Sequence, residues 1–182
     1  MEVARNLLGK RLVRNLNGNR ISGYLTETEA YCGEEDLACH AHVGRTPRNE
    51  VMFGPPGMAY VYFIYGMHWC LNCVTGPEGF PAAVLLRGLQ PCEGLEEIAS
   101  NRKGRPIKDW SSGPGKLCSA LAIDGAFNRR PLFNASSNLW IEEGIPVSAQ
   151  KVSASARVGI ENTPEPWRII PWRFSVHLSE NE

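Results

Sequence analysis

The chain has 182 residues, 43% of them hydrophobic and 21% charged, and its 19 Lys and Arg residues equal its 19 Asp and Glu residues. These values predict a single domain, residues 1–182, with a sizeable core and no repeat or linker, and zero net charge excludes a domain that binds nucleic acid by bulk charge alone. No apolar stretch approaches the length of a membrane span and no secretory signal begins the chain, so we expect an intracellular protein outside membranes.

The pattern of apolar residues and turn residues predicts short helices and a larger number of strands. The expected helices are residues 2–8, 93–102 and 116–123. The expected strands are residues 11–16, 21–31, 59–64, 68–75, 82–89, 139–143, 155–160 and 172–177. Gly and Pro separate these segments, and Asn17-Gly18 is typical of a tight hairpin turn. The fold class is therefore α+β: a compact domain with a mostly antiparallel sheet, surrounding short helices and a protruding hairpin.

The protruding hairpin is the aromatic segment AYVYFIYGMHWCLNCVT, residues 59–75. Alternation puts Tyr60, Tyr62 and Ile64 on one face, and the turn at Gly66 leaves Tyr65 at the tip. A rigid ring at a tip beside a stacking surface suits nucleic-acid bases. The alternative is a core hairpin with an ordinary turn tyrosine, because aromatic strands are usually buried.

The segment TETEAY carries two glutamates at strand spacing. Alternation places Glu27, Glu29 and Tyr31 on one face, with the carboxylates about 7 Å apart. A carboxylate near His40 and aromatic rings is what a base-excising enzyme needs to hold a planar base and direct water at the sugar. The alternative is a solvent-facing edge with ordinary surface glutamates.

Basic residues gather between residues 101 and 116, where Asp109 is the one acid. This segment either lies along phosphates or is a solvated loop. The run Gly113-Pro114-Gly115-Lys116 lacks the first glycine and the Ser or Thr of a phosphate-binding loop. Lys116 at a helix start remains a candidate for contact with one DNA phosphate.

Six cysteines lie mostly in apolar runs and are expected to be reduced core thiols, without a disulfide framework. Cys70 and Cys73 have the spacing of metal ligands, and Cys39, His40 and His42 could complete a zinc site. Residues three apart in a strand point to opposite faces, which argues against that site. We therefore expect no metal, and the signature of zinc deaminases is absent as well.

Four ordered segments carry a resemblance to a known family. They are ETEAYCGEEDLACHAHVGRTPRN, GMAYVYFIYGMHWCLN, AVLLRGLQPCEGLE and SGPGKLCSALAI. In this order they closely resemble the alkyladenine (3-methyladenine) DNA glycosylase family, and the resemblance covers nearly the whole chain.

The resemblance implies a DNA repair enzyme that flips an alkylated or deaminated purine from duplex DNA and hydrolyses its N-glycosidic bond, leaving an abasic site. It also implies a role for each matching residue. Glu29 matches the general base, Arg87 and the main chain of Val158 match groups that hold the water, Tyr31, His40 and Tyr62 match base-binding positions, Asn72 matches a residue that excludes guanine, and Tyr65 matches the minor-groove wedge.

The same resemblance implies a monofunctional hydrolase of double-stranded DNA without a cofactor. Base excision needs one pocket and one wedge, so we expect a monomer, located with the DNA in the nucleus of a eukaryote or in the cytoplasm or nucleoid of a bacterium. We also expect Lys116 and Arg45 to contact DNA phosphates. His68, Trp69 and the stretch 75–81 depart from the best-known members, which affects substrate ranking and affinity more than the reaction. A non-catalytic binder of damaged or distorted DNA that uses the same hairpin is the alternative, and a thiol or zinc protein is a third.

Overall fold

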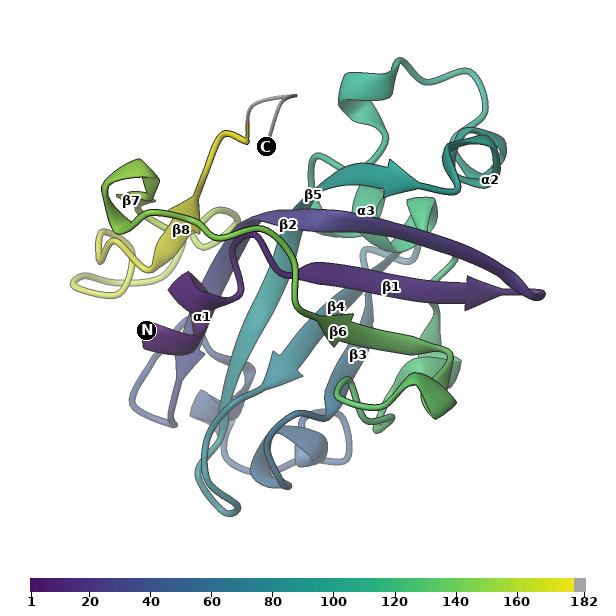
Figure 1. Ribbon diagram of the computed structural model, residues 1–182. Helices are drawn as coiled ribbons and strands as arrows, with labels where there is room; N and C mark the ends of the chain where they lie inside the picture. The colour runs from purple at the N-terminus through teal and green to yellow at the C-terminus, as the bar shows by residue number, and fades with distance from the viewer. Residues whose placement is uncertain (179–182) are drawn as a thin grey trace.

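The computed structural model describes residues 1–178 as an antiparallel sheet with short helices around it (Figure 1). The strands are β1 (Arg11–Leu16), β2 (Asn19–Cys32), β3 (Ala59–Ile64), β4 (His68–Val74), β5 (Ala82–Glu93), β6 (Leu139–Glu142), β7 (Ser153–Ser155) and β8 (Arg173–Ser175). The α-helices are α1 (Glu2–Asn6), α2 (Leu95–Asn101) and α3 (Pro114–Ala120). Single 3-10 turns are η1 (His40–Val43), η2 (Glu50–Phe53), η3 (Ile107–Asp109), η4 (Gly125–Phe127), η5 (Ala135–Ser137) and η6 (Ala149–Lys151). The predicted α+β fold class is confirmed.

The sheet has eight strands in the order β3-β4-β5-β2-β1-β6, with β8 paired to both β2 and β7. All of these pairs are antiparallel. The long strand β2 is at the centre: its first half pairs with β1, its second half with β8, and β5 follows it along the other edge. Register shifts near Leu25 and Glu27 mark bulges where β2 bends.

One row of residues crosses five strands and fixes the position of the site. In register, Tyr60 on β3 faces Asn72 on β4, Asn72 faces Leu85 on β5, Leu85 faces Glu29 on β2, and Glu29 faces Arg173 on β8. Residues directly opposite in an antiparallel sheet share a face. Strand pairing therefore brings residues from distant parts of the sequence to one side of the sheet.

The two faces of the sheet have separate cores. Val61, Leu71 and Leu86 alternate with that row and belong to the main cluster, which also holds Leu117 of α3. The smaller cluster lies on the side of Tyr60 and includes Met52. The smaller cluster is built from β3, β4, β5 and the loop between β2 and β3, and it supports the rings described below.

The β3–β4 turn holds a tyrosine in an unusual conformation. The Met67 N–H donates to the Ile64 carbonyl, and both residues between them have positive φ, 55° for Tyr65 and 67° for Gly66. This is the conformation of the mirror-image turns that join hairpin strands, and it is unfavourable for a bulky side chain. Tyr65 is 77% exposed, so its ring projects from the tip as the sequence predicts.

The predicted elements are mostly present, with shifted ends. The first helix ends at Asn6 instead of residue 8, and α3 runs from Pro114 to Ala120 instead of residues 116–123, because proline suits the first helical position. The predicted strand over 155–160 is wrong. Strand pairing stops at Ser155, since from residue 156 the segment turns toward β2 and bonds to it through Arg157 and Val158.

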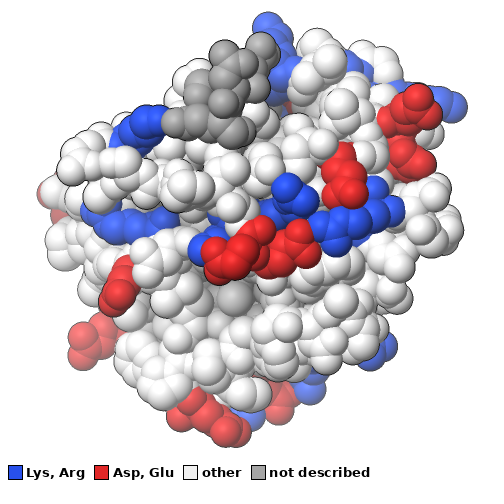
Figure 2. Space-filling model, viewed as in Figure 1, with Lys and Arg blue, Asp and Glu red and all other residues white. Residues whose placement is uncertain are grey.

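Charged side chains of β1, β2, β5 and β6 are paired with one another. Arg20 on β2, for example, pairs with Glu93 on β5 and with Glu142 on β6. Figure 2 shows acidic and basic side chains intermingled in a band across one face of the molecule. Such a mixed band does not attract an anionic polymer as a basic stripe would. Within residues 1–178, no helix is long and apolar enough to cross a membrane.

Candidate functional site

A cavity of about 710 Å³ opens on the sheet face that carries Tyr60 and Asn72. Its walls come from β2, β3, β4 and β5, the loop at η1, the start of α3 and the segment after β7. The residues of interest in its lining are Tyr31, His40, Tyr60, Tyr62, Tyr65, His68, Cys70, Asn72, Arg87, Arg102, Arg105, Asp109, Lys116 and Val158. Eight of the ten sequence-predicted site residues thus meet at one cavity, all except Glu29 and Arg45.

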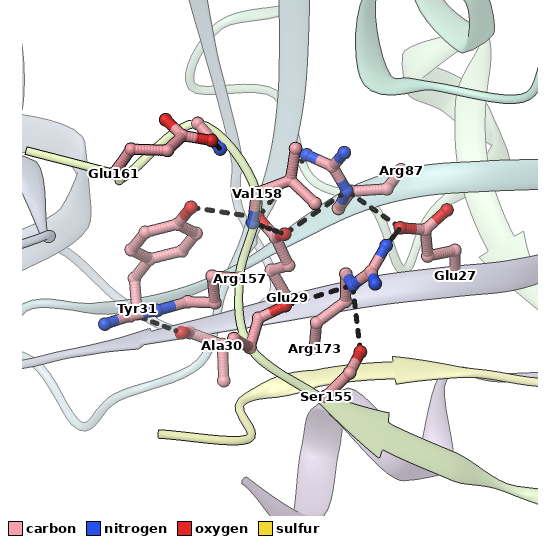
Figure 3. A network of polar contacts seen from close by, with 12 residues as sticks. Glu27, Glu29, Ala30, Tyr31, Arg87, Ser155, Arg157, Val158, Glu161 and Arg173 are labelled. Carbon is pink, nitrogen blue, oxygen red and sulfur yellow. Dashed lines mark hydrogen bonds and ion pairs between the residues drawn. The ribbon is translucent and has the colours of Figure 1, made fainter. Parts of the chain in front are cut away.

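Glu29 lies directly behind the cavity wall. Its side chain is 0% exposed, and three groups that line the cavity hold its carboxylate. The Tyr31 hydroxyl donates to Oε2 over 2.9 Å, the Val158 N–H donates to Oε1 over 2.8 Å, and Arg87 Nε lies 3.3 Å from Oε1 (Figure 3). The reading of Glu29 as an exposed surface residue is therefore wrong.

Burial raises the pKa of Glu29, while Arg87, the Val158 N–H and the Tyr31 hydroxyl act in the opposite direction. Glu27 also raises the pKa of Glu29, by repulsion. A general base is often a carboxylate of this kind: burial raises its pKa toward neutral pH, and hydrogen-bond donors fix the orientation of its oxygens.

Arg87 is shared between two carboxylates. Its Nε donates to Glu27 Oε1 over 3.0 Å, and Arg173 on β8 donates to the same oxygen over 3.2 Å. Figure 3 shows this chain of contacts running from Glu29 through Arg87 and Glu27 to Arg173 and Ser155. The guanidinium beside Glu29 is thereby fixed in orientation and partly neutralised.

Aromatic rings form another wall of the cavity. The ring centroids of His40 and Tyr62 are 4.6 Å apart at 69°, and those of Tyr60 and Tyr62 are 5.2 Å apart at 40°. His40 Nδ1 is 2.8 Å from the Tyr60 hydroxyl. Asn49 fixes the same loop by donating to the His40 carbonyl over 2.8 Å. The rings are thus held by their own packing and by hydrogen bonds.

Burial lowers the pKa of His40 to about 4, with smaller effects from Arg48 and His42. Burial also raises the pKa of Tyr60 to about 12. Both groups are therefore neutral at pH 7, and the wall they form presents neutral rings to whatever enters.

At the mouth of the cavity, the hairpin tip combines exposed apolar groups with a backbone anchor. Met67 is 67% exposed next to Tyr65. The Phe63 ring packs on Trp69 with centroids 4.7 Å apart, and Arg48 donates to the Phe63 carbonyl over 3.2 Å. The base of the tip is consequently rigid while its end is exposed.

The basic segment reaches the cavity only in part. Arg102, Arg105 and Lys116 line it, and Lys116 Nζ lies 3.0 Å from the Asp109 carboxylate, which this contact keeps charged by lowering its pKa. Arg45 lies outside the cavity and contacts Glu50 at 3.5 Å. Neither predicted phosphate contact is tested by this geometry.

The cysteines do not form one site. Cys70 lines the cavity, whereas Cys73 belongs to the main core, so the two lie on opposite faces as alternation predicts. All six cysteines are free thiols; Cys39, Cys70, Cys73 and Cys118 are buried, whereas Cys92 is exposed and is not the core thiol that the sequence predicts. Among residues 1–178 no group of three or more His, Cys, Asp or Glu side chains is arranged to hold a metal ion.

Sequence reasoning missed two contacts of the site. The buried pair of Arg157 and Asp36 adjoins Tyr31, and the Tyr60 hydroxyl contacts His40. The second contact follows from strand alternation, which already put Tyr60 on the face of Tyr62. The first joins residues 121 positions apart and left no signal in the pattern.

The chain is similar to known proteins over nearly its whole length. The family model for methylpurine-DNA glycosylase (MPG) matches residues 1–180. A protein of Methanocella arvoryzae is 51% identical over 175 residues, which cover 96% of this chain and 86% of that protein. A protein of Carboxydothermus hydrogenoformans is 46% identical over 99% of this chain and 90% of its own length. Both carry the name "Putative 3-methyladenine DNA glycosylase". This chain belongs to the methylpurine-DNA glycosylase family.

Proposed function

We propose that this protein is a DNA repair glycosylase that flips alkylated or deaminated purines out of double-stranded DNA and hydrolyses their N-glycosidic bond. Membership of the family makes the chain a DNA N-glycosylase, an N-glycosyl hydrolase. The proposal adds the lesion class, which includes 3-methyladenine, 7-methylguanine, hypoxanthine and etheno-adenine, and the part that each residue plays.

In the proposed complex the extruded purine stacks on the rings of Tyr31 and Tyr62, and His40 contacts it from the side. Stacking on aromatic rings is worth about 1–3 kcal/mol per base and tolerates many base types, which suits a broad lesion range. Asn72, held by its bond to the Tyr60 carbonyl at 3.1 Å, crowds the exocyclic amino group of guanine. Selectivity then comes from this exclusion and from the lower cost of unstacking a damaged base.

Tyr65 serves as the wedge in this proposal. Its exposed ring stands at the rim of the same cavity and on a turn whose backbone is fixed. An inserted ring fills the gap left by the flipped nucleotide and offsets part of the unstacking cost, which is a few kcal/mol. Lys116 and Arg45 are proposed to contact phosphates along the same surface.

Glu29 acts as the general base. The water oxygen bonds to the sugar C1′, its proton passes to Glu29, and the C–N bond breaks with its electron pair leaving on the purine. The developing oxocarbenium character is stabilised by the nearby carboxylate, as in inverting glycosidases. Arg87 and the main chain of Val158 hold the water against the Glu29 carboxylate. No cofactor enters these steps.

The single observation that carries the proposal is the buried Glu29 carboxylate, gripped by Tyr31, Arg87 and Val158 at the wall of an aromatic cavity. A carboxylate that served the fold alone could be buried anywhere in the core, whereas Glu29 lies beside the cavity that would hold the substrate. A DNA glycosylase works where DNA is, so we place the protein with the DNA, as a monomer with one cavity and one wedge.

The test is base release from a duplex oligonucleotide with a single hypoxanthine, followed by chemical cleavage at abasic sites. Native protein should release the base, and Glu29→Gln should bind the duplex without releasing it. Release by both would remove Glu29 from its role. Release by neither, here and on alkylated DNA, with binding retained, would indicate a non-catalytic binder.

A further inference from the structure

Arg157 and Asp36 form a buried ion pair close to the site. Nη1 of Arg157 is 2.6 Å from Oδ2 of Asp36, and Nη2 is 2.8 Å from Oδ1. Both side chains are 0% exposed. Neither residue takes part in the proposed reaction. Because burying two charges is costly, a buried pair at this place suggests another role.

The pair joins three parts of the chain. Asp36 also accepts the N–H groups of Cys32 at 3.2 Å and Ala38 at 3.1 Å, which shapes the loop after β2. Arg157 also donates to the Ala30 carbonyl on β2 over 3.0 Å. Its own segment comes after β7, where strand pairing has ended. The guanidinium therefore fastens an irregular segment to the strand that carries Glu29.

Arg157 contacts the site on two sides. Its Cζ is 4.7 Å from the centroid of the Tyr31 ring and 5.0 Å from that of Trp172. The next residue, Val158, donates its N–H to Glu29 (Figure 3). One side chain thus supports both the ring that lines the cavity and the backbone group that holds the carboxylate.

Stability does not account for this arrangement. Replacing a buried ion pair with apolar groups is often neutral or favourable, because taking two charges out of water costs about as much as their attraction returns. A planar, forked guanidinium instead fixes direction, since it bonds a carboxylate at two points and stacks on rings. Groups behind a site commonly act by such orientation.

We propose that Arg157 and Asp36 are positioning residues that set the Val158 N–H against Glu29 and hold the Tyr31 ring in place. This inference rests on the proposed function for its catalytic consequence, whereas the geometry can be tested without substrate. Neither residue touches the purine or the water in this proposal.

The test uses two variants of the full chain. Arg157→Lys keeps the positive charge and loses the guanidinium that bonds Asp36 at two points. Asp36→Asn keeps the shape of the side chain and serves as the second variant if the first does not fold. Leu139→Ala on β6 is the control, because Leu139 is fully buried at the edge of the sheet away from β3. The readouts are the Val158 amide resonance across a pH titration, the single-turnover rate of base release with its pH profile, and affinity for an uncleavable lesion duplex.

In native protein the Val158 amide should follow the titration of Glu29. In Arg157→Lys and Asp36→Asn the resonance of the Val158 amide should move upfield and should change less with pH. The single-turnover rate of base release should fall by about 100-fold, the usual cost of misplacing a catalytic group by 1 Å. The Val158 N–H bond favours the charged form of Glu29, so its loss raises the pKa of Glu29. The acid limb of the pH profile of base release should therefore move to higher pH. Affinity for the uncleavable duplex should fall less than the rate of base release, because Tyr31 is one of several rings that contact the purine.

Leu139→Ala should lower the melting temperature and leave the amide and the pH profile as in native protein. An unchanged Val158 amide and an unchanged pH profile in the folded variants would overturn the proposal. If the amide responds as expected but native protein releases no base from any lesion duplex, the proposed function fails and the positioning geometry stands.

Discussion

Tyr31 donates its hydroxyl hydrogen to Glu29 over 2.9 Å, and the two residues are two positions apart on β2. Strand alternation puts them on one face, so the ring that lines the cavity and the carboxylate behind it are joined by a single hydrogen bond. In the proposed complex, base stacking and the protonation of Glu29 are therefore coupled through one side chain.

The acid limb of base release should report the ionisation of Glu29. A general base works only when it has lost its proton, and burial raises the pKa of Glu29 above the ordinary glutamate value of 4.5. Activity should therefore rise with pH through a midpoint above 4.5. The measurement is single-turnover release of 7-methylguanine, whose positively charged ring leaves without taking up a proton. A rate that is flat down to the ordinary glutamate value would contradict this role.

Tyr31→Phe should move that acid limb to higher pH. The substitution keeps the ring for stacking and removes one of the donors that lower the pKa of Glu29. A hydrogen bond to a charged group is worth about 1.5 kcal/mol or more, so release on the acid limb should fall by about tenfold. Affinity for an uncleavable duplex should stay near the native value. A large loss of affinity with an unmoved limb would mean that the hydroxyl serves binding instead.

Glu27→Gln should move the acid limb of the pH profile of base release to lower pH. Glu27 raises the pKa of Glu29 by repulsion and shares Arg87 with it, so removing its charge leaves the guanidinium to act on Glu29 alone. The pKa of Glu29 should fall and the acid limb should shift to lower pH. The amide oxygen of glutamine can still accept from Arg87. Opposite shifts in the two variants would separate electrostatics from disturbance of the fold, which would move both profiles alike.

Much of this architecture was predictable because period-two alternation fixes faces. It placed Glu29 with Tyr31, separated Cys70 from Cys73, and left Tyr65 at the hairpin tip. The row from Tyr60 to Arg173 needs strand register as well, and register depends on pairings between segments far apart in the chain.

The remainder depended on tertiary contacts that local patterns do not carry. Residues 155–160 read as a strand because valine and isoleucine favour strands, but Arg157 is drawn to Asp36 and breaks the pairing. The sequence also could not predict that the Glu29 side chain is buried, since a glutamate in a strand is usually at the surface. Its burial depends on Val158 covering it from the other end of the chain.

His40 should remain neutral throughout the working range of pH. Its pKa is lowered to about 4, chiefly by burial, so its ring resonances should not titrate between about pH 5 and 8, where an ordinary histidine gains its proton. Nuclear magnetic resonance of the imidazole carbons measures this directly. Tyr60→Phe removes the 2.8 Å contact with Nδ1 and should slow release by roughly threefold to tenfold, the usual worth of one neutral hydrogen bond. Titration of His40 near its ordinary pKa would contradict the neutral aromatic wall.

Tyr65→Asn should make the protein more stable and less able to capture a lesion. Tyr65 has φ 55°, a conformation that costs a bulky residue about 1 kcal/mol and that asparagine adopts readily. The melting temperature should therefore rise, while affinity for a lesion duplex falls because the wedge is lost.

The first hairpin offers a matched control. Asn17 has φ 53° at the β1–β2 turn, and Asn17→Tyr places tyrosine in the same backbone conformation far from the cavity. That variant should lose about 1 kcal/mol of stability and keep its affinity for DNA. The strain at Tyr65 would then be the cost of presenting a ring at the tip. Equal affinity in Tyr65→Asn and native protein would show that the ring does not enter the duplex.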